Sequence, residues 1–296
     1  MKRKTWALLF AIEAIWAAGL VGALADRRAH QRDPATGINQ WGYRDEAKGS
    51  KEAGERRVAM VGGSSAFEAG MPFPDTLAGQ LFIELRQAGA PARQVYRVVN
   101  LAEPRAAAES YADTLRRYDY LRADAVCIFD GYDALTGIPP HARVRSVVFR
   151  ATGYLPILPA TLLGRPGWLS DADGGVIDVL RDRPGPPDDV SCGGLSKTYC
   201  EAVEAAIRFG LERRYAVLFV TPPAVSSRHL RQQQSLAAAL RARFASEPRF
   251  KHLDLSSIDL ADRVNSPDGV RRTDIGNHVA AQRIATTLLQ WPAFMK

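Results

Sequence analysis

A serine hydroxyl follows the first short apolar segment of this chain, at a position suited to nucleophilic chemistry. The segment RVAMVG, residues 57–62, is followed by Gly63 and Ser64. Glycines let the backbone bend sharply where a strand passes into a helix, and such a bend exposes a hydroxyl above the sheet. The alternative interpretation is an ordinary turn, because Gly-Gly-Ser is a common turn sequence. Ser64 is therefore a candidate nucleophile that needs a base and charge-stabilising donors from elsewhere.

Polar residues also follow the next apolar segments and precede the last helical pattern. The second segment ends in Asn100, and the third is followed by Asp130-Gly131-Tyr132-Asp133. Near the C-terminus, residues 268–277 contain two carboxylates and two arginines. His278 comes next and is a candidate base, although a histidine at a helix start more often faces solvent or caps the helix. These segments supply the remaining groups that a catalytic site would use.

Five apolar segments of strand length alternate with helical patterns along the chain. This alternation is typical of a parallel sheet covered by helices on both faces, with the functional site at the carboxyl ends of the strands. We predict a three-layer α/β/α domain over residues 56–296, with a mainly parallel, flavodoxin-like sheet of five strands. Strands are expected at 57–62, 95–101, 124–129, 215–221 and 250–255, and helices near 75–89, 106–119, 196–213, 227–246 and 277–290.

One segment, residues 134–195, breaks this alternation. It contains an apolar stretch from Val144 to Leu163, followed by a run rich in glycine, proline and aspartate. An insertion after the carboxyl end of a strand can be a lid, a flap resting on a membrane, or a surface subdomain packed for stability. The sequence leaves all three interpretations open.

The N-terminal residues indicate export or anchoring. Residues 1–4 carry three positive charges, and a 20-residue apolar stretch, Trp6 to Ala25, follows and is interrupted by Glu13. Twenty helical residues span about 30 Å, the thickness of a bilayer core. We expect a transmembrane anchor at 1–25 that contacts the membrane through residues 6–25, then a linker and lead-in at 26–55. A signal peptide cleaved after Ala25 and a buried soluble helix are the alternatives.

The anchor and the cleaved signal predict the same compartment for the domain. We expect a single-pass protein of the inner membrane whose domain faces the periplasm or the cell exterior, as part of the cell envelope. There, Cys192 and Cys200 could pair across a short loop, whereas Cys127 lies in an apolar strand and is expected in the core.

The composition excludes several kinds of site. The three cysteines form no CxxC pair and the five histidines form neither HxH nor HExxH, so neither a metal nor another cofactor is expected. The net charge of +7 comes from basic residues interleaved with acidic ones. Because these residues form no stripe, the charge does not indicate a nucleic-acid partner.

Taken in order, the polar segments resemble those of the SGNH, or GDSL-type, hydrolases in their membrane-anchored bacterial branch. The resemblance begins at residues 38–44, INQWGYR, which are similar to the lead-in N-x-x-G-[FY]-R. It continues through GGSSAF, VVNLAEP and FDGYD after the first three strands, includes Val220-Thr221-Pro222, and ends with DGVRRTDIGN. It covers most of residues 38–290. It implies a three-layer domain that cleaves acyl esters, often acetyl groups on carbohydrates.

The resemblance also implies roles for particular residues. In the family a serine attacks the ester carbonyl, a histidine removes its proton, and an aspartate three residues before the histidine orients it. The serine N–H, a glycine N–H and an asparagine side chain stabilise the oxyanion. On this pattern Ser64 is the nucleophile, Asp268 is the orienting acid and Gly63 lies beside the pocket.

Three positions depart from the family pattern. The glycine, asparagine and histidine positions are occupied by Arg105, Asp133 and Arg271. An arginine stays protonated and has no acceptor nitrogen, so Arg271 cannot take a proton from Ser64. An ionised Asp133 would repel a developing oxyanion. We expect Arg271 to form an ion pair with Asp133, Asp268 or both, which would fill the pocket.

Three functional hypotheses follow. The first is an envelope protein of the SGNH fold with degenerate catalysis and a binding or accessory role linked to cell-surface polysaccharide. The second is an active carbohydrate O-acyl (acetyl) esterase or acyltransferase in which Ser64 uses an unconventional base. The third is a purely structural membrane-tethered protein. The first two imply a carbohydrate or acyl-ester ligand, and the sequence names no protein partner.

Overall fold

The centre of the protein is a five-stranded parallel sheet. The computed structural model describes residues 3–31, 37–45, 49–136, 146–158 and 189–295. Every neighbouring pair of strands is parallel, and the order across the sheet is β2-β1-β3-β4-β5. The predicted sheet is confirmed, with strand ends within two residues of the expected bounds. The strands are β1 (Glu55–Gly62), β2 (Val95–Asn100), β3 (Ala125–Phe129), β4 (Ala216–Thr221) and β5 (Phe250–Asp254).

Two strands in the interior of the sheet, β3 and its neighbour β4, are buried along their whole length. Their sequences, AVCIF and AVLFVT, are continuous apolar runs rich in β-branched and aromatic residues. Such strands suit a sheet whose two faces are both covered. Cys127 lies in β3, is buried and forms no disulfide, as expected of a core residue. The edge strand β5 is partly exposed.

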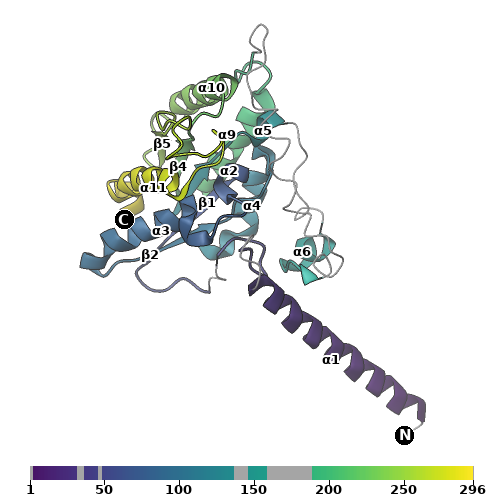
Figure 1. Ribbon diagram of the computed structural model, residues 1–296. Helices are drawn as coiled ribbons and strands as arrows, with labels where there is room; N and C mark the ends of the chain where they lie inside the picture. Colours follow the sequence, from purple (N-terminus) through teal and green to yellow (C-terminus); the bar gives the residue numbers. More distant parts are fainter. Residues whose placement is uncertain (1–2, 32–36, 46–48, 137–145, 159–188, 296) are drawn as a thin grey trace.

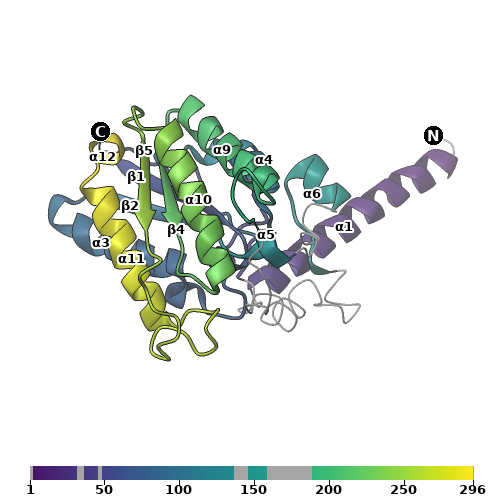
Figure 2. The same cartoon turned by 90° about the horizontal axis from the view of Figure 1, so that it is seen from above.

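Helices cover both faces of the sheet, so the predicted three layers are confirmed. Helices α3 and α11 pack together on one face, and α4, α9 and α10 lie on the other (Figure 2). The principal helices are α3 (Leu77–Gly89), α4 (Tyr111–Arg117), α9 (Lys197–Glu212), α10 (Ser227–Arg243) and α11 (Asp274–Leu289), and the short α12 (Pro292–Met295) ends the chain's described part.

The N-terminal helix, α1 (Arg3–Gln31), projects from the domain and is held at its C-terminal end (Figure 1). It continues past the expected boundary at residue 25, because two of its later residues are buried against the domain. Asp26 accepts a hydrogen bond of 2.8 Å from the Ile157 N–H. The His30 ring lies 2.9 Å from the Leu155 carbonyl oxygen. These contacts attach the end of α1 to the segment after residue 152.

The expected transmembrane helix at residues 6–25 is not supported. Among the helices of the described residues, none is long and apolar enough to cross a membrane. Glu13 and the charged residues 26–28 interrupt the apolar side chains of α1.

The segment 134–195 is described in part. It begins within α5 (Asp133–Thr136) and includes α6 (Val147–Thr152), which lies beside the inner end of α1 (Figures 1 and 2). Residues 137–145 and 159–188, on which the lid and flap interpretations mainly depend, lie outside the described residues. Cys192 and Cys200 form a disulfide, with their Cα atoms 5.6 Å apart, which ties the end of the segment to α9.

Candidate active site around Ser64

Ser64 lies at the carboxyl edge of the sheet, where β1 ends and the one-turn helix α2 (Ser64–Phe67) begins. Two glycines make this placement possible. A Cβ atom at Gly62 would overlap the carbonyl oxygen of Phe129, and one at Gly63 would overlap the carboxylate of Asp133. Close approach of neighbouring segments therefore requires glycine at both positions. The turn brings Ser64 next to the residues that follow β3.

The Ser64 hydroxyl is held by a carboxylate and a backbone amide. Its Oγ donates a hydrogen bond of 2.6 Å to Asp133 Oδ1 and accepts one of 2.9 Å from the Arg105 N–H. The Ser64 N–H donates to Asp133 Oδ2 at 2.8 Å. Asp133 thus binds both donors of Ser64. The two backbone N–H groups that the family resemblance assigns to the oxyanion already have acceptors inside the protein.

Asp133 is a buried carboxyl group with a strongly perturbed pKa. Burial raises the pKa of Asp133 to about 7, although the hydrogen bonds from Ser64 partly offset this effect. The neighbouring Asp130 raises it further. Burial also raises the pKa of Asp130, to about 6, against hydrogen bonds from the hydroxyls of Tyr111 and Tyr199. Asp130 and Asp133, three positions apart in the segment that follows β3, therefore both have a pKa that is raised toward neutrality.

Arg105 has a backbone conformation that favours glycine. Its φ angle is +58°, in the left-handed region that side chains other than glycine rarely occupy. This geometry directs the Arg105 N–H at Ser64 Oγ. Arg105 therefore contributes to the Ser64 site through its backbone N–H.

Asp268 and Arg271 form the predicted ion pair. Arg271 Nε lies 2.6 Å from Asp268 Oδ2, and Asp268 Oδ1 accepts hydrogen bonds from the N–H groups of Val270 and Arg271 at 2.9 and 2.8 Å. Burial alone would raise the pKa of Asp268, but these N–H groups and the Arg271 guanidinium together lower it. The orienting acid of the family pattern therefore holds an arginine here.

The histidines of the described residues bond to groups other than Ser64. His278, the candidate base at the start of α11, lies 3.3 Å from the Gln80 side-chain oxygen. His229 is fully buried on α10, its Nδ1 accepts from the Val225 N–H at 3.3 Å, and burial lowers its pKa to about 4. His30 and His252 bond to a carbonyl oxygen and a threonine hydroxyl. Among the described residues, the side chain that bonds to Ser64 Oγ is therefore the carboxylate of Asp133 and not a histidine.

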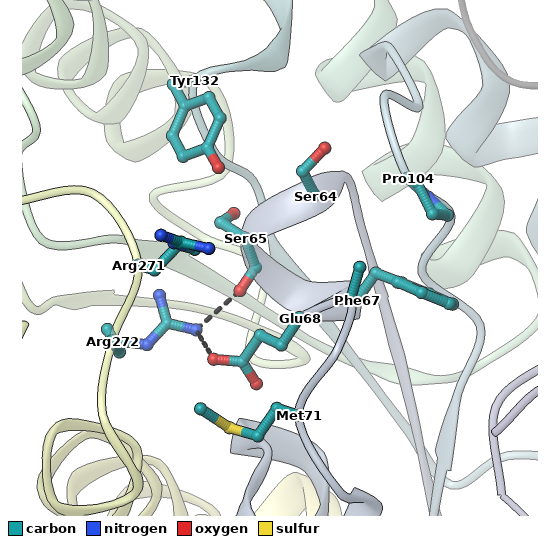
Figure 3. A pocket seen from close by; sticks show the side chains of 10 residues that line it. Ser64, Ser65, Phe67, Glu68, Met71, Pro104, Tyr132, Arg271 and Arg272 are labelled. Carbon is teal, nitrogen blue, oxygen red and sulfur yellow. Dashed lines mark hydrogen bonds and ion pairs between the residues drawn. The ribbon is translucent and has the colours of Figure 1, made fainter. Parts of the chain in front are cut away.

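A second ion pair, which the sequence did not predict, lies under the same pocket. Arg272 Nη2 lies 2.7 Å from Glu68 Oε1 and donates to the Ser65 carbonyl oxygen at 2.6 Å (Figure 3). Its Nε donates to the Asn277 side chain at 2.7 Å, and its guanidinium stacks 4.7 Å from the Phe129 ring centre. Arg272 thereby connects α2, β3 and α11. No sequence pattern marked it, because adjacent arginines in a loop usually face solvent.

The lead-in motif supports the serine helix from the other side. Arg44 is fully buried, and its guanidinium donates to the carbonyl oxygens of Phe67, Glu68 and Met71 at the end of α2. It also lies 5.1 Å from the centre of the Phe67 ring. The backbone before Arg44 is turned by Asn39, whose Oδ1 accepts from the Trp41 N–H at 2.9 Å. The motif thus caps the helix that carries Ser64.

The pocket above Ser64 is small. It has a volume of about 50 Å³, which is room for a few water molecules but is well below the roughly 300 Å³ of a usual ligand pocket. The described residues contain no group of three or more histidine, cysteine or carboxylate side chains arranged to hold a metal ion. The pocket is lined by Ser64, Ser65, Phe67, Glu68, Ala69, Met71, Pro104, Tyr132, Arg271 and Arg272.

Comparison with known proteins gives matches among solved structures. No protein-family profile and no curated sequence matches the chain. A two-domain esterase active on acetylated mannans, crystallised with mannopentaose, is 13% identical with a TM-score of 0.48, and the match covers 80% of this chain and 51% of the esterase. This chain therefore spans about half the length of that protein.

Two further structures match over nearly their whole length. An acetyl xylan esterase is 14% identical with a TM-score of 0.47, covering 78% of this chain and 99% of the esterase. The esterase EstA from Pseudoalteromonas sp. is 8% identical with a TM-score of 0.49, covering 80% of this chain and 98% of EstA. The similarity concerns the arrangement of helices and strands, and no substrate or activity follows from it.

Proposed function

We propose that this chain is an SGNH-type α/β protein whose serine centre is inactive in ester hydrolysis and which serves a binding or accessory role for carbohydrate. The observation that carries the proposal is the carboxylate of Asp133 on both donors of Ser64, at 2.6 and 2.8 Å. A negative group that already holds the N–H and the hydroxyl competes with the oxyanion of a transition state. Losing one oxyanion donor typically lowers the rate about 10²- to 10³-fold.

Two further observations support an inactive centre. Arg271 replaces the histidine base, and its guanidinium is engaged by Asp268. The pocket above Ser64 has a volume of about 50 Å³, well below that of a usual ligand pocket. Removing the base and the oxyanion donors together abolishes most of the rate enhancement that such a site provides.

The proposal is tested with p-nitrophenyl acetate at pH 7 to 8. We expect the full chain to hydrolyse this ester no faster than Ser64→Ala does. The double variant Asp133→Asn/Arg271→His restores two of the three departing family residues, and we expect it to gain turnover that a third substitution, Ser64→Ala, removes. Turnover by the unmodified chain that is at least tenfold above Ser64→Ala would overturn the proposal.

A second candidate function is supported by the same carboxylate. Asp133 Oδ1 lies 2.6 Å from Ser64 Oγ, within reach for proton transfer. Its pKa of about 7 is that of a base matched to neutral pH. In this mechanism Asp133 takes the Ser64 proton as Oγ attacks the acyl carbon, and returns it to the leaving alkoxide as the ester C–O bond breaks. Water or an acceptor hydroxyl then takes the acyl group from Ser64, so that the protein is a carbohydrate O-acyl esterase or acyltransferase.

The single variant Asp133→Asn separates the two functions, because it removes esterase activity if Asp133 is the base and removes none if Asp133 blocks the centre. An asparagine has the shape of the aspartate but cannot accept the serine proton. If Asp133 is the base, Asp133→Asn loses the Ser64-dependent turnover of the unmodified chain. If Asp133 blocks the centre, the unmodified chain has no Ser64-dependent turnover to lose. In that case Asp133→Asn increases the turnover of the Arg271→His variant.

We propose that the domain lies outside the cytoplasm. The support is the Cys192–Cys200 disulfide, because structural disulfides are typical of oxidising compartments. For the ligand we propose a carbohydrate, the class that the resemblance of the polar segments implies. The inner-membrane location itself stays a prediction.

A further inference from the structure

A second and much larger concavity lies away from Ser64. It has a volume of about 1090 Å³, compared with about 50 Å³ for the Ser64 pocket, and the two share no lining residue. It is bounded by the C-terminal end of α4, by α6 and by the lead-in around Trp41. Its size suits an oligosaccharide. We call it the α4–α6 groove, and its lining includes Trp41, Arg117, Tyr120, Phe149 and Arg150.

Aromatic rings form an exposed and fixed surface in this groove. Trp41 is 39% exposed and Tyr120 is 58% exposed. The Trp41 carbonyl oxygen accepts a hydrogen bond of 2.7 Å from the Tyr118 hydroxyl. The Trp41 indole is supported edge-on by Tyr154, with ring centres 6.4 Å apart. Rigid aromatic faces next to water are surfaces on which the apolar faces of sugar rings can stack.

Two arginines add positive charge to the same groove. The Arg117 guanidinium lies 4.6 Å from the centre of the Phe149 ring, and its Nη1 lies 3.4 Å from the Phe149 carbonyl oxygen. Arg150 is exposed on α6. Within the described ranges, neither arginine forms an ion pair with a carboxylate. A third arginine of the rim, Arg116, is already paired with Asp113.

The wall that carries Arg150 is anchored to the domain. Phe149 is buried, so α6 is packed through it. The Leu155 N–H donates to the Gln40 carbonyl oxygen at 2.8 Å, directly beside Trp41. The contacts of Asp26 and His30 hold the residues after α6 in place. The aromatic surface and the backbone that carries the two arginines therefore keep a fixed relation, as a preformed binding site requires.

From these observations we infer that the α4–α6 groove binds an acidic oligosaccharide, with sugar rings on Trp41 and Tyr120 and carboxylates on Arg117 and Arg150. Guanidinium groups bind carboxylates in a bidentate geometry, which fits a uronic acid. Single-stranded nucleic acid also combines stacking with charge. The disulfide favours the carbohydrate, because it is typical of compartments where acidic polysaccharides rather than nucleic acids are abundant. The inference names the ligand class and a site for the proposed binding role, and it does not depend on whether Ser64 is active.

The test is titration of the full chain with tetragalacturonate and, separately, with an unsulfated chondroitin tetrasaccharide. Calorimetry and tryptophan fluorescence measure the binding. Fully methyl-esterified tetragalacturonate is the matched neutral control. We expect at least one acidic tetrasaccharide to bind, and the methyl ester to bind at least tenfold more weakly than its acid. We expect Arg117→Gln and Arg150→Gln each to weaken binding about fivefold to tenfold, and Trp41→Phe to remove the change in fluorescence that Trp41 contributes.

Control variants distinguish this site from the Ser64 centre. Ser64→Ala and Arg283→Gln, which changes an arginine on α11, are expected to leave affinity unchanged. The inference is overturned by absence of binding up to 5 mM, by equal affinity for acid and ester, by an unchanged affinity in both arginine variants, or by tighter binding of an oligothymidylate. Because esterase activity is measured separately, the proposed inactive centre and the groove can fail independently.

Discussion

At the scale of single residues, one carboxylate decides the chemistry of the Ser64 centre. Asp133 occupies the position where the family pattern has an asparagine, and its two oxygens bind the hydroxyl and the N–H of Ser64. An amide in this place would offer a donor to an oxyanion, whereas a carboxylate offers acceptors alone. The raised pKa of Asp133 means that this difference itself depends on pH.

The protonation of Asp133 predicts a pH-dependent stability. Its pKa is about 7 in the folded protein and about 4 in the unfolded chain, so the folded state binds more protons between these values. The unmodified protein is therefore expected to lose stability as the pH rises from 4 to 7, by about 3 kcal/mol from this group. The variant Asp133→Asn is expected not to show this loss of stability, because an asparagine side chain does not titrate. Urea unfolding of both proteins at pH 4, 5.5, 7 and 8 measures the difference, and a constant difference at every pH would contradict the assignment.

At the scale of elements, the serine helix depends on two buried arginines from distant parts of the chain. Helix α2 has a single turn, so its last carbonyl groups need partners outside it. Arg44 supplies donors to three carbonyl oxygens at its end, and Arg272 bonds to the carbonyl oxygen of Ser65. The helix is thus positioned by the lead-in segment and by the loop before α11.

Removing the Arg44 guanidinium is expected to be strongly destabilising. In Arg44→Met the stem still packs, but the three carbonyl oxygens lose a charged donor inside the protein. We expect a loss of about 3 kcal/mol in the free energy of unfolding. Arg283→Met, on the exposed side of α11, serves as the matched control and is expected to change stability by less than about 0.5 kcal/mol. Similar urea midpoints for the two variants would argue against the capping role of Arg44.

At the scale of the whole molecule, the binding surface and the serine centre lie in separate places. The Ser64 pocket is at the carboxyl edge of the sheet, whereas the α4–α6 groove lies against α4 on one side of the domain. The groove exists because α6 packs against the domain at Phe149 and is followed by residues that bond to the end of α1. A disulfide fixes the chain again where it enters α9.

The disulfide is expected to stabilise the domain measurably. Closing a loop of about nine residues restricts the unfolded chain and is worth about 2–3 kcal/mol. We expect Cys192→Ser/Cys200→Ser to unfold at lower urea concentration than the unmodified protein, and dithiothreitol to lower the midpoint of the unmodified protein alone. If the reductant shifts both proteins equally or neither of them, the cysteines are not joined in solution.

Much of the fold was encoded locally and was predictable. The apolar segments that became β1 to β5 and the helical patterns between them reflect burial, which sequence periodicity reports directly. The ends of the apolar segments also predicted that Ser64, Asn100 and Asp133 follow strands. Parallel strands bring their carboxyl ends to one edge of the sheet. The Arg271–Asp268 pair was one of the two pairings expected of Arg271, because only two residues in one loop separate its members.

Other features depended on contacts between distant segments, and the sequence alone could not supply them. The residues around Asp133 in the sequence do not reveal whether its partner is Ser64 or Arg271, because that partner depends on how β1 and β3 pack. The burial of Arg44 and Arg272 and the alignment of Trp41, Arg117 and Arg150 in one groove have the same origin. Sequence pattern determined which elements form and where their polar ends lie. Tertiary packing decided which side chains meet, because contact energies between distant segments leave no periodic trace in the chain.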